Sequence, residues 1–197
     1  IMVANTPKAM APWGAKEAMF GTNPIAFAVP RTDDAPMVID LSLSKVARGK
    51  VMHARKSGTS IPDDWAFDNE GNPTTDPEAA LSGTMAPIGD AKGTALALMV
   101  EILAATLTGA NRSTEMTSFF TADGPSTKAG QFLMALKPHD ASGFAQRLEP
   151  LLSDIAALEG ARLPGARRTA AIAAAEQNGL SVPQAYLDLA RELAQSA

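Results

Sequence analysis

The sequence contains no cysteine, which excludes disulfide bridges and thiolate metal sites and fits a protein of the reducing cytoplasm. It also has no excess of positive charge, because 17 basic residues face 21 acidic ones, for a net charge of -4. A nucleic-acid or anionic-membrane surface is therefore disfavoured. Long apolar runs are missing as well, and no segment reaches the roughly 20 residues that a membrane-spanning helix needs. These absences predict a cytoplasmic protein with neither nucleic-acid nor membrane partners.

Apolar residues, by contrast, make up 46% of the 197 residues, enough to bury one core of ordinary size or two small ones. The first residues, IMVAN, read like the middle of a strand. We therefore expect the chain to be a portion of a longer protein, with a processed chain as the alternative.

Hydrophobic periodicity and turn residues divide the chain into strands, helices and two long connections. Strands are predicted at 25–30, 37–42 and 131–138. Helices are predicted at 43–55, 93–107 and 141–158, after the turn 162–168, and at 182–194. The helix at 93–107 is apolar nearly all round, so it should be buried. The connections cover 56–80 and 108–130, and a loop as long as the first is usually functional or an interface arm.

The order of these elements bears on the fold class. Ser42 or Ser44 is the expected cap of the helix at 43–55. The helix at 141–158 is amphipathic, and its apolar stripe consists of Leu148, Leu151, Leu152, Ile155 and Leu158. Strands and helices do not alternate cleanly, and no G-x-G-x-x-G follows a strand. The pattern predicts a mixed α/β fold of α+β-like character, without a standard dinucleotide-binding motif.

A turn-forming run, PIGD, delivers Lys92 and Gly93 to the start of the apolar helix. The N-terminus of a helix offers unpaired N–H groups and a partial positive charge, to which Lys92 adds a full charge. Such a site suits a carboxylate or a pyrophosphate. The alternative is a solvated lysine beside a helix start.

Two further segments carry candidate binding groups. Asp40-Leu41-Ser42 lies where a strand passes into a helix, a position suited to hydrogen bonding with a ribose or phosphate, although a capping Ser and a turn Asp explain it too. In Arg48-Gly49-Lys50, the arginine is suited to grip a substrate carboxylate, with a solvated helix face as the alternative.

Histidine is scarce, and its spacing argues against metal or triad chemistry. His53 and His139 are the only two, and neither has a Ser or carboxylate beside it at triad-like spacing. No cluster of His, Asp and Glu has metal-ligand spacing, so no metal site is predicted. Both histidines are expected to be structural or exposed.

Five stretches, in this order, resemble the type 2 malate/L-lactate dehydrogenase family: PWGAKEAMFGTNPIAFAVPR, MVIDLSLSKVARGKV, SIPDDWAFDNEGNPTTDP, PIGDAKGTALALMVEILAATLTG and RLPGARR. The resemblance covers nearly the whole chain. It implies hydride transfer between NAD or NADP and a 2-oxo or 2-hydroxy acid, or reduction of a cyclic imino acid. It also implies a family-specific non-Rossmann fold with a mixed sheet, and a homodimer with active sites near the subunit interface. Residues 1–137 would then form a cofactor-binding domain that lacks its N-terminal part, and 138–197 a helical segment packed on the catalytic domain.

The resemblance also assigns roles to residues of this chain. Those matching the cofactor contacts of the family are Thr6, Asp40, Leu41, Ser42, Ala91, Lys92, Gly165, Ala166 and Arg167. Those matching its substrate contacts are Thr22, Arg48 and Gly49.

Three departures from the family pattern qualify these assignments. The catalytic histidine of the family lies in a Ser-His motif that would be upstream of this chain, so no catalytic residue is assigned here. Imino-acid reductases place an aspartate where this sequence has Lys50, which favours a 2-hydroxy acid dehydrogenase. An acidic or polar residue usually stands where this chain has Ala166, which leaves that position only a backbone contribution. If the chain is complete, a non-catalytic cofactor-binding remnant is the alternative, and a separate upstream chain is a possible partner.

Overall fold

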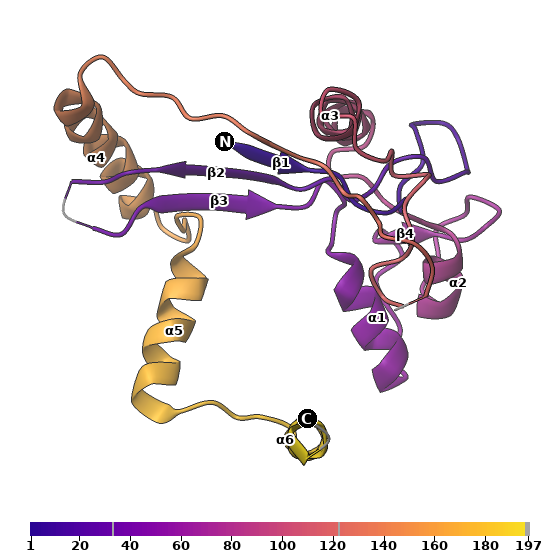
Figure 1. Ribbon diagram of the computed structural model, residues 1–197. Coiled ribbons are helices and arrows are strands. Elements are labelled where there is room, and N and C mark those ends of the chain that lie inside the picture. Colours follow the sequence, from indigo (N-terminus) through magenta and orange to yellow (C-terminus); the bar gives the residue numbers. More distant parts are fainter. Residues whose placement is uncertain (33, 122, 196–197) are drawn as a thin grey trace.

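The computed structural model describes residues 1–32, 34–121 and 123–195, and its centre is an antiparallel sheet (Figure 1). The strand order is β3-β2-β1-β6. The bounds are β1 Met2–Ala4, β2 Ile25–Val29, β3 Met37–Leu41 and β6 Gln131–Leu133. β2 and β3 form a hairpin in which Val29 pairs with Met37 and Ile25 pairs with Leu41. The strands expected at 25–30 and 37–42 are thus confirmed, whereas that expected at 131–138 is shorter.

The expectation of a mixed sheet is wrong for the described strands, since all three neighbouring pairs are antiparallel. β3 begins at Met37, only a short connection after β2 ends at Val29, and it pairs directly with β2. A parallel pair would instead need a crossover of about a dozen residues or more, usually through a helix. The broader prediction of a mixed α/β fold is confirmed by the sheet and its surrounding helices.

A second, small sheet and two helices follow β3. Their bounds are α1 Arg48–Ser57, β4 Ala66–Phe67, α2 Pro77–Ser82 and β5 Thr84–Met85. The long connection at 56–80 is therefore not free of regular structure. Asp76 caps α2 by accepting a hydrogen bond from Glu78 N at 2.9 Å, and Pro77 opens the helix.

The predicted start of the helix at 43–55 is also wrong, because α1 begins at Arg48 and its N-cap, Ala47, makes no side-chain cap. Neither Ser42 nor Ser44 serves as the cap; the Ser44 hydroxyl instead donates to Val46 O at 2.8 Å. Residues 43–45 stay outside the helix because Leu43 N donates to Thr22 O and Lys45 N donates to Ala86 O. These long-range hydrogen bonds outweigh local helix propensity.

The apolar helix comprises α3 (Ala91–Glu101) and a π-helical turn, η1 (Ile102–Thr106). Its inner face carries Ala97, Val100 and Ala104, which are fully buried in the same cluster as Val3 and Met10. The prediction that the whole helix is buried is wrong for the described chain. Four of its large apolar side chains are 41–50% exposed: Leu96, Leu98, Met99 and Ile102.

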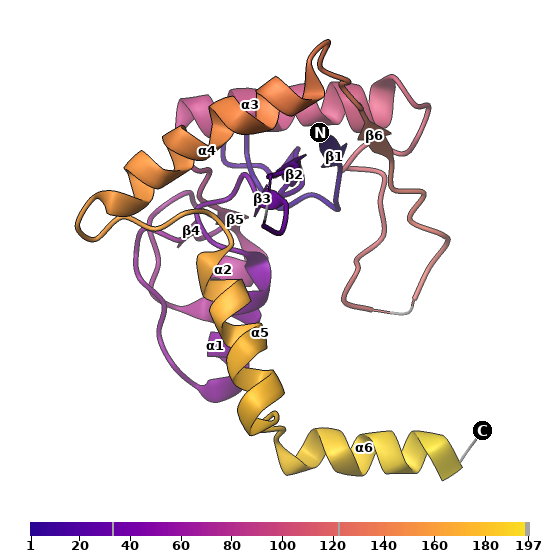
Figure 2. The ribbon, with the colours of Figure 1, turned by 90° about the vertical axis from the view of Figure 1, so that its left-hand side faces the viewer.

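The C-terminal helices are α4 (Ala141–Ala157), α5 (Ala166–Asn178) and α6 (Gln184–Gln195), close to their predicted positions. α4 lies beside the sheet, whereas α5 and α6 extend away as an arm (Figure 2). Neither arm helix contains a buried residue. The predicted apolar stripe of α4 is only partly covered, since Leu152 is 3% exposed but Leu151 is 57% exposed.

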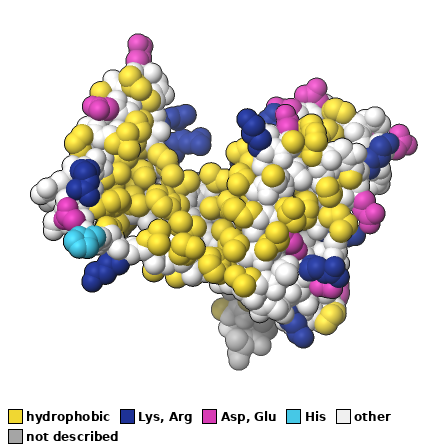
Figure 3. Space-filling view, turned by 90° about the horizontal axis from the view of Figure 1, so that it is seen from above, with side chains coloured by type: hydrophobic (Ala, Val, Ile, Leu, Met, Phe, Trp, Pro, Cys, Tyr) yellow, Lys and Arg dark blue, Asp and Glu magenta, His cyan; other side chains and the backbone are white. Residues whose placement is uncertain are grey.

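Seen from above, apolar side chains form a broad band across the molecule (Figure 3). An apolar groove of about 640 Å³ lies between the sheet and the segment leading into α4, with Phe27, Val38 and Leu136 among its lining residues. Contiguous apolar surface of this kind marks a docking surface. No helix in the described ranges is long and apolar enough to cross a bilayer.

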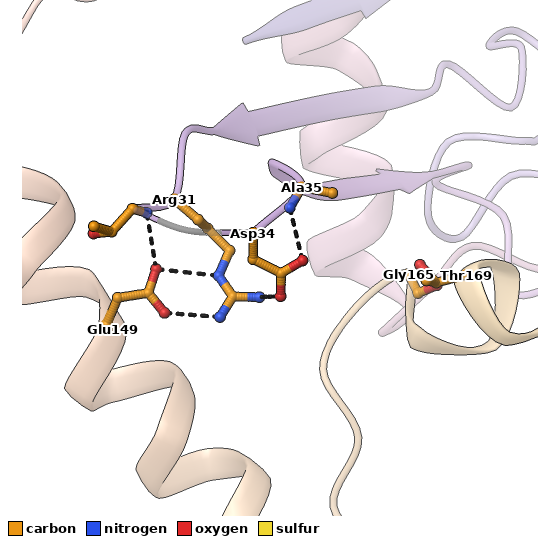
Figure 4. Close-up of polar contacts among 7 residues, drawn as sticks. Arg31, Asp34, Ala35, Glu149, Gly165 and Thr169 are labelled. Atoms are coloured by element: carbon orange, nitrogen blue, oxygen red, sulfur yellow. Dashed lines mark hydrogen bonds and ion pairs between the residues drawn. The ribbon is translucent and has the colours of Figure 1, made fainter.

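An ion pair ties α4 to the hairpin. The Arg31 guanidinium donates from Nη2 to Glu149 Oε2 at 2.7 Å and from Nε to Oε1 at 3.2 Å, and it also contacts Asp34 (Figure 4). The hydrogen bond from Arg31 lowers the pKa of Glu149 below its ordinary 4.5.

The pairing predicts that the attachment of α4 depends on pH. A carboxyl with a lowered pKa stabilises the fold above its unfolded pKa and loses that contribution as the pH falls through the folded value. Below about pH 4.5, the amides of 141–157 should therefore lose protection against hydrogen exchange, after correction for the intrinsic pH dependence of exchange. The Glu149→Gln variant is the control, and it should lack this pH-dependent loss of protection. Identical pH profiles for the two proteins would contradict the role of the ion pair.

Candidate functional site

Two predicted contact residues, Thr6 and Thr22, lie together on neighbouring loops. Thr22 N donates to Thr6 Oγ1 at 2.9 Å, and the two hydroxyl oxygens are 3.4 Å apart. Gly21 permits this approach, because a Cβ there would overlap with the carbonyl and hydroxyl oxygens of Thr6. Both threonines are only partly buried. The two hydroxyls therefore form a single polar position open to a ligand.

The exit of β3 connects this pair to the start of α3. Leu43 N donates to Thr22 O at 2.7 Å, and Ile88 N donates to Leu43 O at 2.8 Å. Asp40-Leu41-Ser42 therefore ends between the threonine loop and the turn that precedes Lys92. Asp40 and Leu41 are exposed, and the Ser42 hydroxyl lies 3.1 Å from Ser44 Oγ.

The start of α3 has an exposed lysine and no side-chain cap, although Lys92 N itself donates to Gly89 O at 3.1 Å. Ala91 is its first residue, and the preceding Asp90, at φ 56°, makes no side-chain cap. Lys92 is exposed, and no carboxylate of the described residues forms an ion pair with it. First-turn N–H groups and an unpaired ammonium together favour a phosphate or carboxylate.

Gly93 is required by packing at this same turn. A Cβ at Gly93 would overlap with the carbonyl oxygen of Ile88, which belongs to the backbone and cannot swing away. We expect Gly93→Ala to lower the free energy of unfolding by about 1–3 kcal/mol, as measured by urea denaturation.

Gly49→Ala provides the matched control for this prediction. Nothing lies within 4 Å of a Cβ built at Gly49, which sits in the first turn of α1. The control should be neutral or stabilised by about 0.5–1 kcal/mol, as expected for Gly to Ala in a helix. Equal stabilities for the Gly93→Ala variant and the wild type would show that the turn relaxes freely.

The third predicted cofactor segment, residues 165–167, comes from the C-terminal part of the chain and begins close to β3. Gly165 has φ 82°, and a Cβ there would lie 3.7 Å from Val38 O on β3. α5 starts at Ala166, and Thr169 N donates to Gly165 O at 3.0 Å (Figure 4). Ala166 and Arg167 are exposed at the first turn of α5. A second helix N-terminus therefore lies next to the strand that carries Asp40.

Arg48 occupies a separate cleft. Its guanidinium donates to Leu81 O at 3.0 Å and to Lys8 O at 3.3 Å, and burial lowers the pKa of Arg48. The cleft has a volume of about 460 Å³, and its charged lining residues are Lys8, Lys16, Glu17 and Arg48. Three cations against one carboxylate favour an anionic ligand. Gly49 is exposed at the edge of this region, and Thr22 does not line the cleft.

The two histidines lie on the surface. His53 and His139 are exposed, and the nearest side-chain partner of His53 is Ser57, at 3.5 Å. Across the described ranges, no three His, Asp or Glu side chains gather in a group able to hold a metal ion.

Sequence reasoning missed two features of the site. One is the pair Lys8 and Lys16, whose positions beside Arg48 depend on loops that no local pattern places. The other is a buried network around Glu101 beneath the threonine pair. The signal that could have indicated this network is Glu101 itself, which is the only acidic residue within the apolar helix.

Comparisons with known proteins place the chain in a family. The family model for malate/L-lactate dehydrogenase matches residues 1–189. The chain therefore belongs to this family, as its motifs predicted.

Individual relatives share both sequence and fold. The chain is 50% identical over 194 residues to the (2R)-3-sulfolactate dehydrogenase (NADP⁺) of Chromohalobacter salexigens, across 98% of this chain and 58% of that protein. It is 43% identical to Δ1-pyrroline-2-carboxylate reductase 2 of Burkholderia multivorans, across 91% of this chain and 54% of that protein. The crystal structure of Δ1-piperideine-2-carboxylate reductase from Pseudomonas syringae pv. tomato matches with a TM-score of 0.85 and 37% identity, across 98% of this chain and 59% of that one. The chain thus spans a little over half the length of these relatives.

Proposed function

We propose that the chain is the cofactor-holding part of an NAD(P)-dependent oxidoreductase that interconverts a 2-oxo acid and a 2-hydroxy acid. The convergence of three predicted cofactor segments on β3 and its exit carries the proposal. Asp40 and Leu41 lie on β3 and Ser42 follows it, and Gly165 lies close to Val38 O of the same strand. Lys92 lies four residues after Ile88, whose N–H donates to Leu43 O. The site would bind its nicotinamide cofactor outside a Rossmann fold, and the name of the sulfolactate relative supports NADP.

The residues at this convergence fit a dinucleotide. Lys92 and the uncapped start of α3 would hold a phosphate, and the exposed Asp40 carboxylate would accept from a ribose hydroxyl. Gly165 lets the backbone approach closely because it carries no side chain. When bound, the cofactor supplies the hydride; the protein supplies orientation and electrostatic stabilisation.

The substrate end of the proposal rests on cations and hydroxyls. Thr22 would donate to the substrate from the threonine pair, and Arg48 would hold a substrate carboxylate from the separate cationic cleft, which Thr22 does not line. Neither His53 nor His139 lies in a Ser-His motif like that of the family, so no residue of this chain is proposed as the proton donor.

Reduction of a cyclic imino acid is the second candidate. The similarity to pyrroline- and piperideine-2-carboxylate reductases favours it, whereas Lys50 in place of an aspartate opposes it. Steady-state assays of the complete polypeptide with NADPH separate the two. Faster oxidation of NADPH with an open-chain 2-oxo acid supports the first proposal, and faster oxidation with a cyclic imine supports the second. Cofactor binding without turnover would leave only the non-catalytic remnant.

We further propose that the protein is a homodimer, with residues 1–137 as the cofactor-binding domain and 138–197 as the helical segment attached to it. The exposed outer face of α3, the apolar groove and the arm of α5 and α6 support this arrangement. Sedimentation equilibrium of the complete polypeptide tests it. A monomer at micromolar concentration would contradict the homodimer. The cytoplasmic location stays a prediction from the sequence.

A further inference from the structure

A buried carboxylate lies beneath the threonine pair. Glu101 is the last residue of α3 and is 7% exposed. It is followed directly by the π-helical turn Ile102–Thr106, a distortion that often occurs at functional sites. Burying a carboxylate is costly unless donors surround it, and an apolar residue would suit this helix better. The buried Glu101 carboxylate therefore needs hydrogen-bond donors around it.

One side of the Glu101 carboxylate holds Ser113, which is fully buried. Ser113 N donates to Oε1 and Ser113 Oγ donates to Oε2, both at 2.6 Å. The same hydroxyl accepts from Gly21 N at 2.9 Å. Glu101 thereby fixes the residue that precedes Thr22.

The other side of the carboxylate holds Asn23, which is also fully buried. Asn23 Nδ2 donates to Glu101 Oε2 at 2.9 Å, and Asn23 Oδ1 accepts from Thr6 N at 3.2 Å. Asn23 has φ 37°, a backbone conformation that few non-glycine residues adopt, and its side-chain hydrogen bonds hold it there. Through this amide, Glu101 also fixes the loop that carries Thr6.

We infer that Glu101 is a positioning residue that sets the separation of the Thr6 and Thr22 hydroxyls. The two loops are joined at the surface by the Thr22 N to Thr6 Oγ1 hydrogen bond and from below by one carboxylate. The inference rests on the proposed function, in which Thr6 contacts the cofactor and Thr22 the substrate. Glu101 itself touches neither.

Glu101→Gln is the sharpest test because it keeps the shape of the side chain. A glutamine has one oxygen for three donors, and its amide nitrogen would oppose a donor from Asn23 or Ser113. Hydrogen exchange of the cofactor-free protein should accelerate about tenfold at the amides of Gly21, Thr6 and Thr22. Thr108→Val is the matched control, since it removes a hydrogen bond to Ala104 O from the Thr108 hydroxyl, which lies in the turn that follows η1. The control should leave those amides unchanged.

The kinetic arm uses a double-mutant cycle in the complete polypeptide. Glu101→Gln should raise the substrate KM about tenfold in the wild type but less than about twofold when Thr22 is already valine, because the two changes disturb one contact. An equal rise in both backgrounds, or unchanged exchange at the three amides, would overturn the inference. If Glu101→Gln does not fold, Ser113→Ala replaces it in both arms. If the wild type does not bind the cofactor, the proposed function is contradicted. The hydrogen-exchange measurement would still test whether Glu101 positions the two threonine loops.

Discussion

Replacing Lys92 with alanine is expected to weaken binding of the nicotinamide cofactor by about 1–3 kcal/mol, the scale of one charge-assisted hydrogen bond. That loss corresponds to a roughly 5- to 150-fold rise in Kd. The expectation follows from an exposed ammonium that forms no ion pair among the described residues and stands in the uncapped first turn of α3. Isothermal titration of NADPH measures it directly.

The controls for Lys92 separate a specific contact from general electrostatics. Lys56→Ala removes an exposed lysine from the last turn of α1, at the other end of that helix from Arg48, and should leave the Kd unchanged. Lys92→Arg keeps the charge and should retain most of the affinity. An unchanged Kd in folded Lys92→Ala would remove the lysine from the cofactor site. Equal losses in Lys92→Ala and Lys56→Ala would reduce its role to net charge.

Replacing Arg48 with alanine should raise the substrate KM by about 10- to 150-fold, because a charged hydrogen bond to a carboxylate contributes about 1.5–3 kcal/mol. Cofactor affinity should change far less, since the guanidinium lies in the cationic cleft and not on β3. Steady-state kinetics with the 2-oxo acid varied at saturating NADPH give the KM, and calorimetry gives the cofactor Kd.

Arg48 also has a structural role, and the experiment must separate this role from substrate binding. It ties Lys8 O to Leu81 O, so its loss removes two internal hydrogen bonds. Arg48→Lys keeps the charge without the planar fork and should recover only part of the KM. Lys56→Ala, in the exposed last turn of the same helix, is the control for charge alone. Wild-type kinetics in Arg48→Ala would take the arginine out of the site.

Local patterns predicted the elements whose cause is local. Short apolar segments predicted the strands at 25–30 and 37–42, but their antiparallel pairing was not predicted and follows from the shortness of the connection between them. The turn before Lys92 predicted the start of α3 within two residues. The Asp-Pro-Glu signal that starts α2 was also local, and it was hidden by the turn residues around it.

Long-range contacts decided what the sequence did not predict. The late start of α1 depends on carbonyls of Thr22 and Ala86, far away in the chain. Apolar residues on all sides of α3 predicted that the whole helix is buried. The sequence did not show what would cover its outer face. The cationic cleft and the Glu101 network likewise bring together loops distant in sequence, so only the fold reveals them.

Oxidation of NADPH by the complete polypeptide, followed on addition of a 2-oxo acid, is the most direct test of the proposed activity. We expect saturable oxidation that depends on the 2-oxo acid and is slowed by Arg48→Ala. No oxidation by a folded, NADPH-binding protein with either a 2-oxo acid or a cyclic imine would contradict the proposed oxidoreductase.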